Sequence, residues 1–251
     1  MTSDEDGDIS SFQYDLIWSS GASIPMNSPK NFNQSIGFKE KPLWRGLSHQ
    51  YAFFVSIFTG LVIVWYSASH AQGDFLALLS VAVFALSVSL LLGVSALYHR
   101  VQWDACAGEF MRKCDHASIY FLICGTYTPI MIKGLHSETS RLVLSIVWGV
   151  SLLGIGIEFF APRAPKWLKA VIYVAIGWVA VAVVSQIYSS MGPWAVALIS
   201  LGGVFYTVGA LVYALKRPQI KPEVFGYHEL FHLFVIAGAL THYVLVFMFV
   251  V

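Results

Sequence analysis

The chain has 251 residues, of which 57% are hydrophobic and only 12% are charged, and its formal net charge is +1. Soluble domains carry about a quarter charged residues, so this composition, gathered into long apolar runs, excludes an ordinary soluble domain and predicts an all-α polytopic membrane protein. The lysines and arginines form no cluster of the kind that binds nucleic acid. Cys106, Cys114 and Cys124 are an odd number without paired spacing, which argues against a disulfide scaffold.

The first segment, residues 1–40, is polar and acidic at its start, and we predict a disordered cytosolic tail. It lacks the basic and apolar regions of a signal peptide, so the first membrane helix must act as its own insertion signal. Residues 41–251 then form one membrane domain. Trp44 and Arg45, just before its first apolar run, suit the headgroup level of a bilayer.

Seven apolar spans follow in this domain, each long enough for a helix to cross a bilayer. We predict them at residues 50–68, 74–99, 115–133, 141–160, 167–189, 194–215 and 227–251. Proline and glycine at several of the breaks, such as Met191-Gly192-Pro193, stop one helix before the next begins. The pattern predicts a seven-transmembrane-helix bundle.

Basic residues set the orientation of this bundle. All of the 15 lysines and arginines except Lys133 and Arg141 fall in the N-terminal segment or in the loops on its side. We therefore expect the N-terminus in the cytosol and the C-terminus on the opposite side. The protein is predicted to be an integral, multi-pass protein of a plasma or inner membrane, or of an internal eukaryotic membrane.

The last span begins Tyr227-His228-Glu229-Leu230-Phe231-His232. His228 and His232 are four residues apart, which puts both imidazoles on one face of a helix, one turn apart. Polar side chains at the mouth of an apolar helix are costly unless something pairs with them. A divalent metal would supply that partner.

Two other predicted helices place polar residues at the same depth. The second span ends there with His99, four residues after Ser95, and the third span starts there with Asp115. Three imidazoles with an open fourth position are the ligand set of a catalytic zinc site. We predict that His99, His228 and His232 bind Zn²⁺ near the cytosolic leaflet. Asp115 would take a proton from the bound water, and Ser95 would steady that water or a developing oxyanion.

Two other interpretations of these residues stay open. Interfacial histidines also reach outward and bind lipid headgroups without any metal. The string His228-Glu229-Leu230-Phe231-His232 matches the zinc-protease signature, in which the glutamate is the general base. The string is short, however, and Glu229 also suits the positive end of a helix N-terminus, so it gives only weak support for a protease.

Strings near the span ends, in this order along the chain, resemble those of one family. They are Lys41-Pro42-Leu43-Trp44-Arg45-Gly46-Leu47-Ser48-His49, Ser95-Ala96-Leu97-Tyr98-His99-Arg100, Asp115-His116-Ala117 running to Gly125-Thr126-Tyr127-Thr128-Pro129, and Gly226-Tyr227-His228-Glu229-Leu230-Phe231-His232. The chain is similar to the hemolysin III family, within the progestin and adipoQ receptor superfamily that includes adiponectin receptors. This resemblance implies a seven-helix fold with zinc near the cytosolic side. The family's serine, aspartate and zinc histidines fall on Ser95, Asp115, His99, His228 and His232.

Three functions follow from the site and the resemblance. The first is a zinc-dependent hydrolase of a lipid amide or ester, because the superfamily resembles alkaline ceramidases; its partners would be membrane lipids and its substrate ceramide-like. The second is a receptor or signalling protein in which zinc is structural. The third is a pore-forming cytolysin, which the family name suggests, although no span shows the repeated polar face that a water-filled channel needs.

Overall fold

The computed structural model describes residues 42–70, 74–161, 166–221 and 223–251. The predicted disordered tail, residues 1–40, lies outside the described residues. The helical elements are α3 (Leu47–His70), α4 (Phe75–Arg100), α5 (Ala105–Gly134), α6 (Ser137–Phe160), α7 (Lys166–Gly177), the 3-10 segment η1 (Val179–Val183), α8 (Val184–Leu215) and α9 (Tyr227–Phe249).

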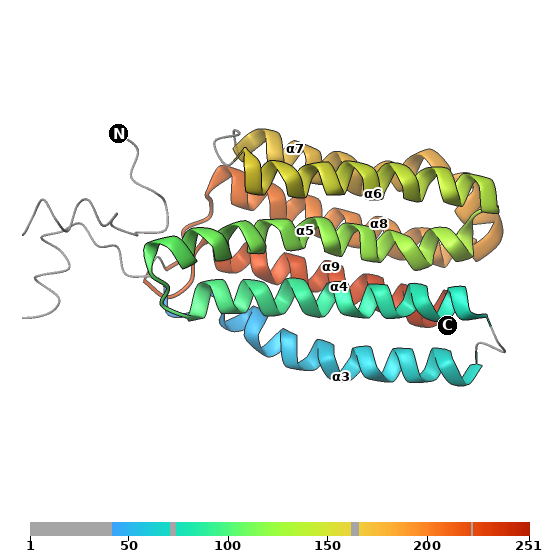
Figure 1. The fold of residues 1–251 in the computed structure, drawn as a ribbon, viewed down its shortest axis with the longest axis horizontal. Coiled ribbons are helices and arrows are strands. Elements are labelled where there is room, and N and C mark those ends of the chain that lie inside the picture. Colours follow the sequence, from blue (N-terminus) through green and yellow to red (C-terminus); the bar gives the residue numbers. More distant parts are fainter. Residues whose placement is uncertain (1–41, 71–73, 162–165, 222) are drawn as a thin grey trace, which may run out of the picture.

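The helices lie side by side along one axis and form an elongated bundle (Figure 1). α5 packs against both α4 and α6, α9 packs along α8, and α3 packs on α4. The centre of the bundle is apolar, with Ile63, Phe84 and Val147 fully buried. Large apolar side chains such as Phe58 and Leu153 are each 70% exposed. Such a surface suits lipid and not water.

Within the residues that the structure describes, five helical segments are long and apolar enough to cross a membrane: Leu47–His70, Phe75–Arg100, Ser137–Phe160, Val171–Leu215 and Tyr227–Phe249. The predicted all-helical membrane bundle is confirmed at this coarser level. α5 falls short of this hydropathy because polar residues such as His116, Thr126 and Thr128 occur along its length.

The third helix begins earlier than the sequence analysis predicts. α5 starts at Ala105, so most of the loop expected before residue 115 is helical. Asp104 is the N-cap, and its carboxylate accepts hydrogen bonds from the backbone N–H groups of Cys106 and Ala107. This capping satisfies helix donors that would otherwise lack partners, and it allows the helix to start in a charged segment.

The predicted span at residues 167–189 is interrupted, because η1 separates α7 from α8. The hydroxyl of Tyr127 on α5 lies at this interruption. It is 3.0 Å from the carbonyl oxygen of Ile176 and 2.9 Å from that of Gly177, and it accepts a hydrogen bond from the N–H of Ala180. A side chain inserted into the backbone ladder breaks a helix, and no local pattern in the sequence signals it.

The predicted break at Met191-Gly192-Pro193 is present within α8. Gly192 has φ +80° and ψ 178°, a backbone conformation that residues with a side chain rarely adopt, and Pro193 follows it. α8 is therefore divided into two helical parts by this one residue.

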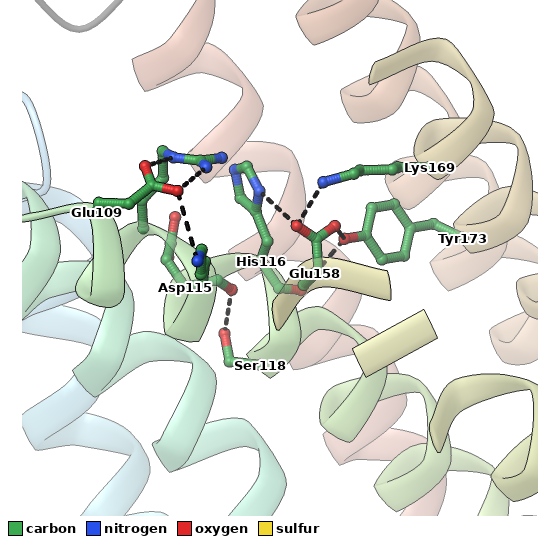
Figure 2. Close-up of polar contacts among 9 residues, drawn as sticks. Glu109, Asp115, His116, Ser118, Glu158, Lys169 and Tyr173 are labelled. Atoms are coloured by element: carbon green, nitrogen blue, oxygen red, sulfur yellow. Dashed lines mark hydrogen bonds and ion pairs between the residues drawn. The ribbon is translucent and has the colours of Figure 1, made fainter. Parts of the chain in front are cut away.

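A buried polar cluster joins α5, α6 and α7 (Figure 2). Glu158 on α6 is fully buried, and its carboxylate accepts a hydrogen bond of 2.6 Å from Nζ of Lys169. Nδ1 of His116 lies 3.4 Å from the same oxygen, and the hydroxyl of Tyr173 lies 3.3 Å from the other. A charge buried in an apolar bundle needs such partners, so this cluster sets how the three helices meet.

We predict that Glu158→Gln lowers the free energy of unfolding by about 3–5 kcal/mol, because it leaves the buried Lys169 ammonium without its counter-charge. The measurement is thermal unfolding of the purified protein in detergent. Glu109→Gln is the matched control, since the carboxylate of Glu109 is 47% exposed and pairs with Arg112 at the surface. That change should cost less than about 1 kcal/mol. Equal losses of stability in the two variants would contradict the prediction.

Candidate metal centre

The three predicted histidine ligands lie together at one end of the bundle. His99 occupies the last turn of α4, and His228 and His232 occupy the first two turns of α9. The Nε2 atoms of His99 and His228 are 3.2 Å apart. One ring nitrogen from each of the three residues can be chosen so that all lie within 4.8 Å of one another.

This arrangement fits a metal ion such as Zn²⁺. Zinc binds imidazole nitrogens at about 2.0–2.1 Å, so neighbouring nitrogens in a tetrahedral site are about 3.3 Å apart. The separation of 3.2 Å between His99 and His228 agrees with that geometry. His99 and His232 are buried, and Nδ1 of His232 has no hydrogen-bond partner within the described part of the chain. Buried imidazoles with nitrogens facing one another are suited to share a cation.

Asp115 and Ser95 lie beside this centre. Oδ2 of Asp115, on α5, is 3.9 Å from Nε2 of His99, which is beyond direct hydrogen-bond length. Ser95 lies one turn before His99 on α4 and is buried. Both residues line a cavity of about 490 Å³ that also borders His228 and His232. The structure therefore places the predicted acid and serine on a hollow that reaches the histidines.

The cavity extends from the histidines into the bundle between α4, α5, α7, α8 and α9. Much of its wall is apolar, including Leu91, Ile119 and Leu122 near the centre and Ile130 and Met131 further along α5. Its lining also includes the polar side chains of Arg112, His116 and Lys169. No local pattern in the sequence brings these three residues together, because only the folded bundle places α7 beside α5. A cavity of this kind suits an elongated amphiphile.

Glu229 does not face the histidine centre as a zinc-protease base would. Nε of Arg45 donates a hydrogen bond to Oε1, and the N–H of Gly226 donates to Oε2 at 2.7 Å. The carboxylate thus caps the start of α9 and holds the segment before α3. Both oxygens are engaged in structural contacts, and the structure favours the capping interpretation over the protease one.

His49 is a site residue that the sequence analysis missed. Its ring stacks on that of His232 with centroids 3.8 Å apart and an interplanar angle of 14°, and it is only 2% exposed. Neither ring nitrogen of His49 has a hydrogen-bond partner among the described residues. Its place in the string that begins at Lys41 was the one signal in the sequence. Spacing could not reveal it, because α3 and α9 are at opposite ends of the chain.

Comparisons with known proteins identify the family of the chain. A family model described as Haemolysin-III related matches residues 38–243. The chain is 28% identical over 193 residues to the hemolysin-3 homolog of Bacillus subtilis, covering 77% of this chain and 86% of that protein. It is 26% identical over 204 residues to hemolysin-3 of Bacillus cereus, covering 80% and 88%.

A further relative comes from an animal. The adiponectin receptor protein of Drosophila melanogaster is 28% identical over 177 residues, covering 64% of this chain and 40% of that protein. The resemblance expected from the sequence strings is thereby confirmed. With its membrane-type helices and a family match over most of its length, the chain belongs to the haemolysin-III-related family of integral membrane proteins.

Proposed function

We propose that this protein is a zinc-dependent hydrolase of a membrane lipid amide or ester, with a ceramide-like lipid as the substrate class. The observation that carries the proposal is the group of three histidines, two of which, His228 and His232, line a largely apolar cavity that has Asp115 and Ser95 in its wall. Zinc held by His99, His228 and His232 would polarise the substrate carbonyl and bring the pKa of a water toward about 7.

The residues around the centre supply the other requirements of hydrolysis. The carboxylate of Asp115 would accept a proton from the attacking water and return it to the leaving nitrogen or oxygen, so that an acid and an amine or alcohol are released. The hydroxyl of Ser95 would donate a hydrogen bond to the carbonyl oxygen as negative charge develops there. The apolar walls would hold the acyl chain and keep bulk water away.

The proposal includes the topology predicted from the sequence. Seven crossings require that α5 spans the membrane together with its neighbours α4 and α6, and that the two parts of α8 divided at Gly192 belong to different crossings. The basic residues then put the N-terminus and the histidine centre on the cytosolic side. Substrate would enter from the inner leaflet.

A receptor is the second candidate, favoured by the similarity to the Drosophila adiponectin receptor protein. In that case the same three histidines would hold a structural metal, and Asp115 would not act on a substrate. The two functions differ in whether the purified protein releases fatty acid from lipid amides: a hydrolase does so, and a receptor does not.

We expect purified protein to contain about one zinc per chain, and His99→Ala, His228→Ala and His232→Ala each to lose it. Two remaining imidazoles hold zinc much more weakly than three, since structural and catalytic sites use three or four protein ligands. Metal content is measured by mass spectrometry. His136→Ala is the control, because His136 is exposed at the start of α6. An unchanged zinc content in the three variants would show that these histidines do not bind the metal.

Asp115→Asn should keep the zinc and lower kcat for release of fatty acid from a ceramide or lipid-amide panel by about 10²–10⁴-fold, since a positioned proton acceptor contributes that much. Asp104→Asn is the matched control on the same helix, because asparagine also caps a helix N-terminus. If zinc-loaded wild-type protein releases no fatty acid from any member of the panel, the hydrolase proposal fails and the receptor proposal gains.

We also expect His49 to position His232, because the two rings are stacked. His49→Ala should weaken zinc binding by about tenfold, as loss of a group supporting a metal ligand typically does. His49→Phe should restore it, because a phenyl ring can still stack. Competition with a zinc chelator gives the affinities. A phenylalanine variant as weak as the alanine variant would show that stacking is not the contribution.

A further inference from the structure

The deep part of the cavity contains polar groups that the proposed hydrolysis does not use. Thr126 on α5, Tyr206 on α8 and His242 on α9 all line it. The Thr126 hydroxyl, the Tyr206 hydroxyl and Nδ1 of His242 are buried, and none has a hydrogen-bond partner in the described portion of the chain. Thr126 and His242 are only 5% and 7% exposed. Unpaired polar groups inside an apolar bundle cost free energy, so they point to a ligand.

Two of these groups are held by a reciprocal fit of α8 and α9. The ring of Tyr206 lies against Gly238, where an added Cβ would be 2.8 Å from the ring. The ring of His242 lies against Gly202, where an added Cβ would be 2.3 Å from Nε2. Each ring therefore occupies the space that a glycine of the other helix leaves open. The two ring centroids are 5.6 Å apart, so both polar groups belong to one location.

The depth of this location is set by the two helices that start at the metal centre. His242 follows His232 by ten residues on α9, and Thr126 follows Asp115 by eleven on α5, so each lies about 15 Å along its helix from the centre. A chain that spans this distance has roughly a dozen methylenes, because an extended zigzag chain with carbon–carbon bonds of about 1.5 Å advances only about 1.25 Å per carbon.

The hydrogen-bonding capacity of the groups selects the ligand chemistry. Nε2 of His242 lies 3.4 Å from the carbonyl oxygen of Ile199, which can only accept, so the ring hydrogen belongs on Nε2. Nδ1 is then an acceptor, while the Tyr206 hydroxyl can donate. A hydroxyl group on a ligand can donate a hydrogen bond to Nδ1 of His242 and accept one from the hydroxyl of Tyr206. A methylene group can do neither.

We propose that this deep location is a specificity subsite for a lipid acyl chain that carries a hydroxyl group near its twelfth carbon. The inference rests on the proposed function, because it takes the acyl chain of the substrate or product to lie in the cavity with its carbonyl end at the histidines. It adds that the chain is selected by one internal hydroxyl.

The test is competition of 12-hydroxystearate and stearate against radiolabelled stearate bound to the full-length, zinc-loaded protein in detergent. We expect 12-hydroxystearate to bind about fivefold to tenfold more tightly than stearate, since the subsite offers it a donor and an acceptor. Tyr206→Phe should reduce this ratio to about twofold or less and leave stearate affinity unchanged. Detergent partition is the same for every variant, so changes in the ratio report on the protein.

Tyr243→Phe is the matched control, because the hydroxyl of Tyr243 donates to the carbonyl of Thr59 and Tyr243 does not line the cavity. It should keep the wild-type ratio. Equal affinities of the two fatty acids in wild-type protein, or a ratio unmoved by Tyr206→Phe, would overturn the subsite. Absence of binding by both fatty acids would also overturn the subsite. The proposed hydrolase function is decided separately, by the zinc content and the release of fatty acid from lipid amides measured on the same preparation.

Discussion

The burial of imidazoles at one end of an apolar bundle is the constraint on which the arrangement of α3, α4 and α9 depends. A buried polar group without a partner costs about 1–3 kcal/mol, so the helices must meet in a register that brings the nitrogens together. In this register the Nε2 atoms of His99 and His228 lie 3.2 Å apart. The contact of Arg45 with Glu229 fixes the start of α9, and the stack of His49 on His232 brings α3 to the same place.

The two acids near this centre have different environments, and this separates their roles. Both oxygens of Glu229 accept hydrogen bonds from structural donors, one on Arg45 and one on the backbone of Gly226. Asp115 instead borders the cavity, with one oxygen 3.9 Å from the ring of His99. The proposed hydrolysis needs a proton acceptor that reaches the substrate side of the site, and the position of Asp115 suits that role better than the position of Glu229.

The features that could be predicted from the sequence are those encoded by short-range patterns. The hydrophobic runs indicate the helices, and the spacing of four between His228 and His232 places them on one face. The early start of α5, which Asp104 caps, was missed because a single capping residue in a charged loop is a weak signal. The interruption at η1 was missed because its cause, the hydroxyl of Tyr127, comes from another helix.

Contacts between distant segments account for the other missed features of the site. The partners of Glu158 come from α5 and α7, and those of His49 from α9, so neither sequence neighbourhood indicates them. His242 could be placed about 15 Å beyond His232 by helical rise alone. Its relation to Tyr206, however, depends on two glycines of facing helices, and pairing between helices is not a property of either segment.

The polarity of the cavity changes along its length in a way that would orient an amphiphile. Arg112 and Lys169 line the cavity near Asp115, His228 and His232, and apolar side chains such as Leu122 follow. A lipid entering with its polar end inward would bury that group against these apolar side chains, at a cost of several kcal/mol. The opposite orientation would keep the polar end near these charged side chains and put the first carbons of the chain beside the histidines. For the proposed lipid substrate, the charged end of the cavity therefore favours the orientation in which the amide or ester, the bond next to the headgroup, lies beside the histidines.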